Sequence, residues 1–267
     1  MSRASKTTPT DVPDDLAERS SLLWDGPVRP SRGPKPSLSR EEFIRAAIAI
    51  ADADGLGAVT MQGVSAPLGC TPMAIYRYFP NKDALIDAIV DSAMGTPPAR
   101  TGPRKPWRAE VREWAYAKRA MLTSRPWLAE LPFVAAPHGP NWLSWHEAFL
   151  QAIAECGLSP EDMMDMLSVV DGYVRGNSDT AISLARARAR GISFEEWAAA
   201  VGRDLARAIG DDRYPMLSAI LGLASGGLEQ GGSLPAKAGR PRTIEECFDF
   251  GLERVLDGIE KYIESLA

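Results

Sequence analysis

The sequence predicts an all-α fold, with a small helical domain near the N-terminus and a larger one after it. Ser, Thr or Asn repeatedly precedes a run of helically spaced apolar residues, often with Glu three positions later. Gly or Pro ends most of these runs. No stretch alternates apolar and polar residues as a half-buried strand does. The 267 residues are enough for two domains with cores of their own.

Composition narrows the class of protein. Apolar residues make up 45% and charged residues 24% of the chain, as in globular proteins, and the net charge is −5. The three widely spaced cysteines indicate neither a disulfide framework nor a metal site, so we expect a reduced, cytoplasmic protein. No apolar run reaches the roughly 18 residues of a membrane span. Residues 26–82 nevertheless hold seven Lys/Arg and four Asp/Glu, a net +3 that fits a local anion-binding face.

Residues 1–37 have the composition of a flexible extension, rich in Ser, Thr and Pro. Within them, the four prolines of residues 26–36 favour extended backbone, and Arg29, Arg32 and Lys35 recur every three residues. We interpret this segment as a basic arm. Two roles stay open for it, an arm that enters the minor groove of DNA and a solvated linker.

Four helices are expected in residues 38–95, each behind a capping residue. They run from Ser39 to about Asp54, from Thr60 to about Leu68, from Thr71 with Pro72 at the first position, and from Asn81 through Ala93. The segment "GTPP" that begins at Gly95 then breaks the chain and marks a domain boundary.

The second domain, residues 104–267, is expected to hold longer helices. They cover residues 107–124, 141–156, 160–190 and 193–210, a short piece after Tyr214-Pro215, and 243–265. Residues 225–242 have the Gly-rich composition of a mobile loop.

Residues 60–82 form a helix-turn-helix, two short helices joined by a tight turn at Gly69. Such a unit lays its second helix in the major groove of DNA. The candidate contacts are Thr71, Tyr76, Tyr78 and Lys82 for phosphates, and Pro72, Met73 and Ala74 for thymine methyl groups. The alternative is that Tyr76 and Tyr78 only pack a small core, as we expect of Ile75 and Phe79.

The sequence resembles the tetracycline-repressor (TetR) family over residues 38–265. "LSREEFIRAAIAIADADGLGAVTMQGVS" and "YRYFPNKDAL" carry the resemblance in the first domain, and "RPWLAEL", "GYVRGN", "YPMLSAIL" and "FDFGLERVLDGIE" carry it more weakly in the second. The resemblance implies a three-helix DNA-binding domain followed by a helical ligand-binding and dimerisation domain. It also implies a homodimeric repressor that a small molecule releases from a near-palindromic operator in double-stranded DNA.

Residue roles carry over by position. The resemblance places Thr60 and Tyr76 at phosphates or the groove edge, Gln62, Pro72 and Met73 at bases, and Tyr78 and Lys82 at phosphates. Gly63 and Pro67 depart from the family pattern, which prefers good helix formers there. Because Pro67 removes the bond to the Gly63 carbonyl, we expect a short or bent first helix in the motif.

Aromatic and polar residues concentrate in the middle of the second domain, where the resemblance implies a pocket for a planar, partly apolar ligand. The candidate ligand residues are Trp127, Phe133, His138, Trp142, Trp145, His146, Phe149, Asp171, Tyr173, Arg175 and Asn177. The alternative is an ordinary aromatic core. We expect no metal and no cofactor.

The helices over 160–190 and 243–265 have broad apolar faces, and the resemblance implies that they form a two-fold interface. The predicted interface residues are Met163, Met166, Leu167, Val170, Phe248, Leu252, Val255, Leu256 and Ile259. Two other functions stay open, a DNA-binding regulator without a small-molecule effector and, remotely, an enzyme. Against an enzyme, the sequence has no Gly-rich phosphate loop, metal-ligand cluster or nucleophile motif.

Overall fold

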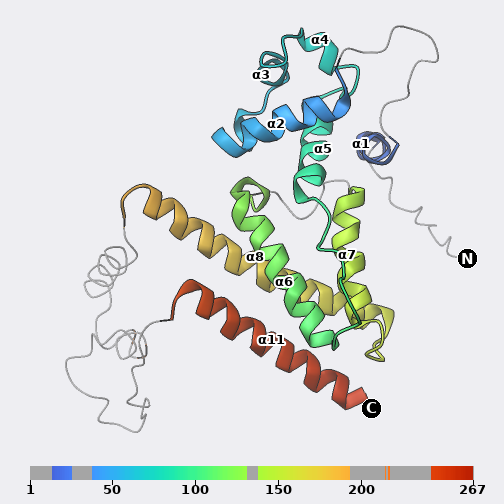
Figure 1. Ribbon diagram of the computed structural model, residues 1–267, viewed down its shortest axis with the longest axis vertical. Coiled ribbons are helices and arrows are strands. Elements are labelled where there is room, and N and C mark those ends of the chain that lie inside the picture. Colours follow the sequence, from blue (N-terminus) through green and yellow to red (C-terminus); the bar gives the residue numbers. More distant parts are fainter. Residues whose placement is uncertain are drawn as a thin grey trace, which may run out of the picture. The chain divides into compact units, whose positions relative to one another are not determined.

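The computed structural model describes residues 14–25, 38–130, 138–192, 214, 216 and 242–266, and in this part of the chain every regular element is a helix (Figure 1). The elements are α1 (Asp14–Trp24), α2 (Arg40–Asp54), η1 (Leu56–Ala58), α3 (Met61–Ser65), α4 (Pro72–Ile75), α5 (Lys82–Met94), α6 (Trp107–Ser124), η2 (Pro126–Leu128), α7 (Pro140–Ile153), α8 (Pro160–Ala189) and α11 (Ile244–Leu266). The all-α prediction is confirmed. The helix expected over 193–210 lies outside the described residues, and so does the loop expected over 225–242 except for its last residue.

The chain divides into two compact units, Met1–Arg175 with Leu252–Ala267, and Gly176–Gly251. The first unit holds α1 to α7, the beginning of α8 and most of α11. The described residues of the second unit are mainly the end of α8 and the beginning of α11. The sites described below belong to the first unit, and so does the segment after Gly95 where we predicted a domain boundary.

The capping residues act largely as predicted. Ser39 and Glu42 form a reciprocal capping box at the start of α2, with the Glu42 amide donating to Ser39 Oγ over 3.2 Å and the Ser39 amide donating to Glu42 Oε2 over 2.7 Å. Asn81 Oδ1 accepts from the Ala84 amide over 2.8 Å at the start of α5. A second capping box at Thr243 starts α11.

The first helix of the helix-turn-helix is short, as Pro67 predicts. α3 ends at Ser65, and the chain turns through residues 66–69 before Gly69 adopts a positive φ of 64°. α4 follows, with Pro72 at its first position. Together α2, α3, α4 and α5 bury one apolar core.

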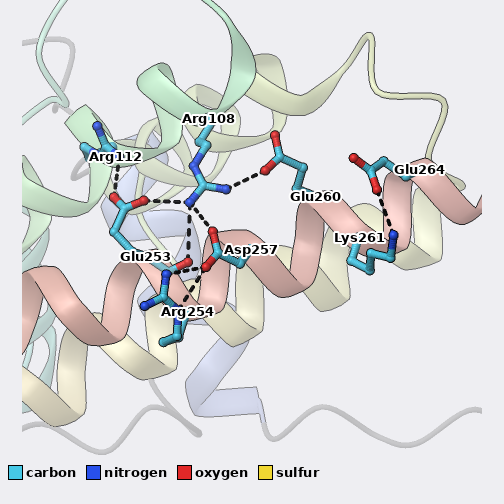
Figure 2. Close-up of polar contacts among 8 residues, drawn as sticks. All are labelled: Arg108, Arg112, Glu253, Arg254, Asp257, Glu260, Lys261 and Glu264. Atoms are coloured by element: carbon cyan, nitrogen blue, oxygen red, sulfur yellow. Dashed lines mark hydrogen bonds and ion pairs between the residues drawn. The ribbon is translucent and has the colours of Figure 1, made fainter.

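Ion pairs join α6 to α11 (Figure 2). The Arg108 guanidinium reaches three carboxylates of α11, Glu253 at 2.6 Å, Asp257 at 2.5 Å and Glu260 at 2.8 Å, and Arg112 also contacts Glu253. The hydrogen bond from Arg108 lowers the pKa of the Glu253 carboxyl, and Arg112 adds to this effect. Each surface pair is weak alone, but the shared guanidinium fixes which turns of the two helices meet.

The predicted dimer face is wrong in part, because much of it is used inside the chain. Six of its residues are buried in the single chain, namely Leu167, Val170, Phe248, Leu252, Leu256 and Ile259. A helix with one apolar stripe buries that stripe against its own core first. The exposed apolar side chains on α8 and α11 are instead Met164, Val169, Phe250, Tyr262 and Leu266.

The start of α7 is capped by a carboxylate from α5. Asp91 accepts from the Trp142 amide over 2.9 Å, from the Asn141 amide over 3.3 Å and from the Asn141 side chain over 3.1 Å. These are amides that a helix N-terminus leaves without intrahelical partners. Gly139 lies against this carboxylate, and a Cβ atom built on it would stand 2.3 Å from Asp91 Cγ.

Gly139→Ala is therefore expected to destabilise the protein by about 1–3 kcal/mol, because the added methyl group displaces the capping carboxylate. The measurement is urea unfolding. Gly57→Ala is the matched control, since a Cβ there meets nothing within 4 Å, and its effect should stay within about 0.5 kcal/mol. Equal stabilities for the two variants would contradict this account of the α5–α7 junction.

Candidate functional site

The helix-turn-helix exposes the side chains predicted to read DNA. Met73 is 74% and Tyr76 46% exposed, large values for an apolar and an aromatic side chain. The other predicted residues that are exposed are Thr60, Gln62, Thr71, Pro72 and Lys82. The surface thus presents apolar, hydroxyl and cationic groups around one short helix, α4, which is the chemistry that base edges and phosphates require.

The opposite side of this unit forms its core. Ile75 and Phe79 are buried, as predicted. Tyr78 is half-buried, its ring lies 5.6 Å from Phe43, and its hydroxyl donates to the Leu38 carbonyl over 2.7 Å. Because that bond uses the only hydroxyl proton, a phosphate could not accept from Tyr78 without breaking it. The packing alternative therefore describes Tyr78, whereas Tyr76 remains a surface residue.

The two threonines of the motif behave differently. Thr60 Oγ1 accepts from the Gly63 amide over 2.9 Å and caps α3. A Cβ atom on residue 63 would stand 2.9 Å from this oxygen, which accounts for the glycine that departs from the family pattern. Thr71 occupies the N-cap position of α4, but its side chain makes no capping bond, contrary to prediction. Its exposed hydroxyl is therefore available to a ligand.

The N-terminal extension differs from expectation in one part. Residues Asp14–Trp24 form α1, which packs on α5 and buries Leu23, rather than a flexible tail. The predicted basic arm residues Arg29, Arg32 and Lys35 lie outside the described residues. Their role stays a prediction.

The predicted ligand residues of α7 join a buried aromatic cluster. Trp114 of α6 lies edge-on to Trp145, with ring centres 6.1 Å apart, and to Phe149, at 5.1 Å. The Trp114 indole donates to the Trp145 carbonyl over 2.8 Å, and the Trp145 indole donates to the Gly95 carbonyl over 3.0 Å. Edge-to-face packing with satisfied indole N–H groups fixes the positions of these three rings.

Charged groups lie beside this aromatic cluster. Lys118 is 2% exposed, its Nζ is 3.3 Å from Asp171, and it lies 5.4 Å from the ring centres of both Trp114 and Trp145. Burial lowers the pKa of the Lys118 ammonium, and the Asp171 carboxylate partly offsets this. Arg175 approaches the same carboxylate at 3.4 Å. Two cations, Lys118 and Arg175, therefore approach one carboxylate within aromatic surroundings.

Two histidines flank a tryptophan at the start of α7. The His138 ring stacks on Trp142 at 3.7 Å between centres, and Trp142 stacks on His146 at 3.5 Å. His146 Nδ1 lies 3.0 Å from the Trp142 carbonyl, and because a carbonyl only accepts, the neutral ring carries its proton on Nδ1. Burial lowers the pKa of His146 most, against the effect of this hydrogen bond, and burial also lowers the pKa of His138.

Other predicted ligand residues are not brought to this cluster. The Trp127 indole donates to Asp52 of α2 over 2.7 Å, and Asn177 belongs to the second unit. Tyr173 is half-buried on α8, and Phe133 lies outside the described residues. A cleft of about 580 Å³ between residues 96–105, α6 and α7 contains none of the predicted ligand residues.

Sequence reasoning missed Trp114 and Lys118. A signal for both was present, because Val111, Trp114, Ala115, Lys118 and Leu122 fall on one helical face. A lysine on an otherwise apolar stripe predicts a buried cation with a partner. Within the described ranges, no group of three His, Cys, Asp or Glu residues could hold a metal ion. In the same ranges, no helix is both long and apolar enough to cross a membrane.

The histidines predict a pH dependence of stability. Because both pKa values are lowered by folding, the unfolded chain takes up protons first as the pH falls below about 6.5, and stability is lost there. The chain has only these two histidines, so His138→Gln/His146→Gln removes the whole effect. Urea unfolding at pH 7.5 and 5.5 should show that the wild type loses more free energy of unfolding than the double variant does. His146 contributes at most about 1.4 kcal/mol per pH unit to this difference. Equal losses in the two proteins would contradict the lowered histidine pKa values.

Comparison with known proteins agrees with this arrangement. Residues 43–89 match the family described as "Bacterial regulatory proteins, tetR family", and residues 101–263 match "Tetracyclin repressor-like, C-terminal domain". The chain is 32% identical over 257 residues to the HTH-type transcriptional repressor DrrR1 of Streptomyces coeruleorubidus, covering 95% of this chain and 89% of that protein. It is 26% identical over 247 residues to the HTH-type transcriptional repressor Rv1353c of Mycobacterium tuberculosis, covering 89% and 86% of the two chains.

A solved structure shares the fold. Apo ActR from Streptomyces coelicolor superposes with a TM-score of 0.67 at 20% identity, over 88% of this chain and 100% of that one. ActR in complex with actinorhodin gives 0.62 at 21% identity, over 83% and 95%. The two family matches cover the helix-turn-helix and most of the remaining chain. The protein therefore belongs to the tetR family and is a DNA-binding transcriptional regulator, not an enzyme.

Proposed function

We propose that the protein is a homodimeric repressor that binds a near-palindromic operator and releases it when a small, partly aromatic ligand binds. The observation that carries the DNA-binding part is the exposed surface of α4. An apolar side chain as exposed as Met73, next to Tyr76 and the uncapped hydroxyl of Thr71, is unfavourable in water and is explained by contact with base edges and phosphates.

The buried aromatic cluster around Trp114 supports the proposal that a small molecule binds. The walls are aromatic, from Trp114, Trp145 and Phe149, and the polar groups converge from α6 and α8. Aromatic walls with a few convergent polar groups, Lys118, Arg175 and Asp171, favour a planar, partly aromatic ligand. ActR, which has the same fold, has been solved with actinorhodin and with (S)-DNPA, so this fold accommodates small molecules.

Exposed apolar side chains on α8 and α11 support the dimer. Met164, Val169 and Tyr262 are 50%, 52% and 37% exposed. Gly172 and Gly258 are also exposed on these helices, and neither has a neighbour within 4 Å of a built Cβ atom. Partly apolar, exposed helix faces of this kind suit a two-fold interface, which would set the α4 helices of the two protomers about 34–36 Å apart on DNA.

One observation favours a second candidate, a regulator without a small-molecule effector. The ring stacks at the start of α7 are close, and the cleft beside Trp114 contains none of the predicted ligand residues. In this alternative the charged cluster is a structural core and another protein supplies the signal.

Footprinting of the DNA that flanks the gene, across a salt series and with a library of planar aromatic compounds, tests the proposal. A protected near-palindrome is expected, with affinity falling steeply as salt rises because each neutralised phosphate contributes about −0.9 to the log–log slope. A releasing ligand at 100 times its Kd should also raise stability by about 2.7 kcal/mol. Protection that no ligand relieves would favour the second candidate, and the absence of any protected site would reject operator binding there.

The two threonines give a matched pair of variants. Thr71→Val should weaken operator binding by about 2- to 10-fold without loss of stability, because its hydroxyl caps nothing and is available to DNA. Thr60→Val should lower stability by about 1 kcal/mol, because its hydroxyl caps α3. Gel-shift titration and urea unfolding of both variants separate the two effects. Thr71→Val with wild-type affinity would remove that hydroxyl from the interface.

A further inference from the structure

α1 is attached to α5 by a charged clamp (Figure 1 shows α1 beside α5). Arg19 Nε donates to Asp87 Oδ2 over 2.6 Å and Arg19 Nη2 donates to Asp87 Oδ1 over 2.7 Å. The Asp87 side chain is 4% exposed and that of Arg19 17%. A bidentate pair with so little water around it is directional, and breaking it removes two charge-assisted hydrogen bonds from a buried carboxylate.

The C-terminal end of α1 contacts the DNA-binding domain formed by α2 to α5, which we call the reading head. The Leu22 carbonyl accepts from Arg40 Nη2 over 3.3 Å, and Leu23 is 8% exposed. The Arg40 guanidinium also lies over the ring of Phe79, 5.4 Å from its centre. Phe79 lies four residues after the end of α4, its amide donates to the Ile75 carbonyl over 3.0 Å, and its buried ring belongs to the core on which α4 rests. Arg40 thus connects α1 to Phe79, which belongs to the core beneath α4.

The last residue of α1 contacts the other half of the unit. Trp24 Nε1 donates to the His138 carbonyl over 3.1 Å. His138 precedes Gly139, which lies against the capping carboxylate of Asp91, and its ring begins the stack with Trp142. A shift at the start of α7 is therefore transmitted to Trp24 through one hydrogen bond.

The contacts of Arg19 and Trp24 depend on each other, because both require α1 to be folded. α1 has 11 residues, fewer than a helix needs to persist alone in water, so it is folded only while docked. Loss of the anchor at either Arg19 or Trp24 releases the constraint on the other. The helix consequently behaves as one element with two arrangements, docked and undocked, which is what coupling between sites requires.

We propose that α1 is a clasp that couples the start of α7 to the reading head, so that its docking raises operator affinity. Arg19 and Trp24 are positioning residues for DNA binding, and a ligand that displaces the His138–Trp142–His146 stack weakens that binding by releasing Trp24. The proposal rests on the proposed function for its DNA readout. It assigns the region before the helix-turn-helix a regulatory role of its own.

The test compares Arg19→Ala, Trp24→Phe and the double variant by gel shift on the footprinted operator. Each single change should weaken binding by about tenfold, and the double variant should be no weaker than the poorer single one, because either change undocks the same helix. Arg19→Asp combined with Asp87→Arg should restore affinity. Arg100→Ala, which removes the exposed arginine of an ion pair with Glu110 away from α1, is the matched control and should bind as the wild type does.

Amide hydrogen exchange decides the proposal without DNA. Arg19→Ala should speed exchange of residues 141–146 about tenfold, although the ion pair of Arg19 is with α5 and not with α7. Unchanged exchange there, additive losses of affinity, or wild-type affinity with an undocked α1 would each overturn the clasp. If the wild type binds no DNA but the exchange effect appears, the proposed function fails and the coupling through α1 stands.

Discussion

The carboxylates of Asp87 and Asp91, one turn apart on α5, join both α1 and α7 to this helix. A buried carboxylate is unfavourable unless cations or N–H donors surround it, so each of these residues dictates what packs against it. Asp91 supplies the anion that the amino end of α7 lacks in its own sequence, since Gly139 has no capping side chain. Asp87 orders α1 in the same way. α5 is therefore both a wall of the reading head and the surface on which the second half of the unit begins.

The reading head depends on this support because its own helices are very short. α3 has five residues and α4 has four, too few for either to persist alone. The exposed positions of Met73 and Tyr76 are set by what lies beneath them, above all Ile75 and Phe79 in the core. Affinity for DNA and packing of the interior are therefore linked properties of this domain, and a change in either appears in the other.

Local signals in the sequence predicted most of the helices, because caps and helix stops act over three or four residues. Ser39 and Asn81 start helices where expected, and Pro67 shortens α3. The misses involve partners distant in the chain. The residues near Arg19 do not indicate its aspartate partner 68 residues away, so the sequence predicts a flexible tail where α1 forms. The predicted interface residues were wrong in part for a related reason, since an amphipathic pattern does not say whether a helix buries its stripe in its own chain or in a partner.

The attachment of α1 has a consequence for building hybrid regulators, in which the DNA-binding part of one relative is joined to the sensor part of another. The family match begins at residue 43, and a graft cut there would leave Arg19 on one protein and Asp87 on the other. A second cut after α5, where the sensor part is joined, would also separate Asp91 from the glycine that accommodates it. A hybrid that carries residues 14–94 as one block, and has glycine at the recipient position equivalent to 139, preserves both the Arg19–Asp87 pair and the contact of Asp91 with that glycine. The exchangeable module of this protein is thus larger than the motif by which its family is recognised.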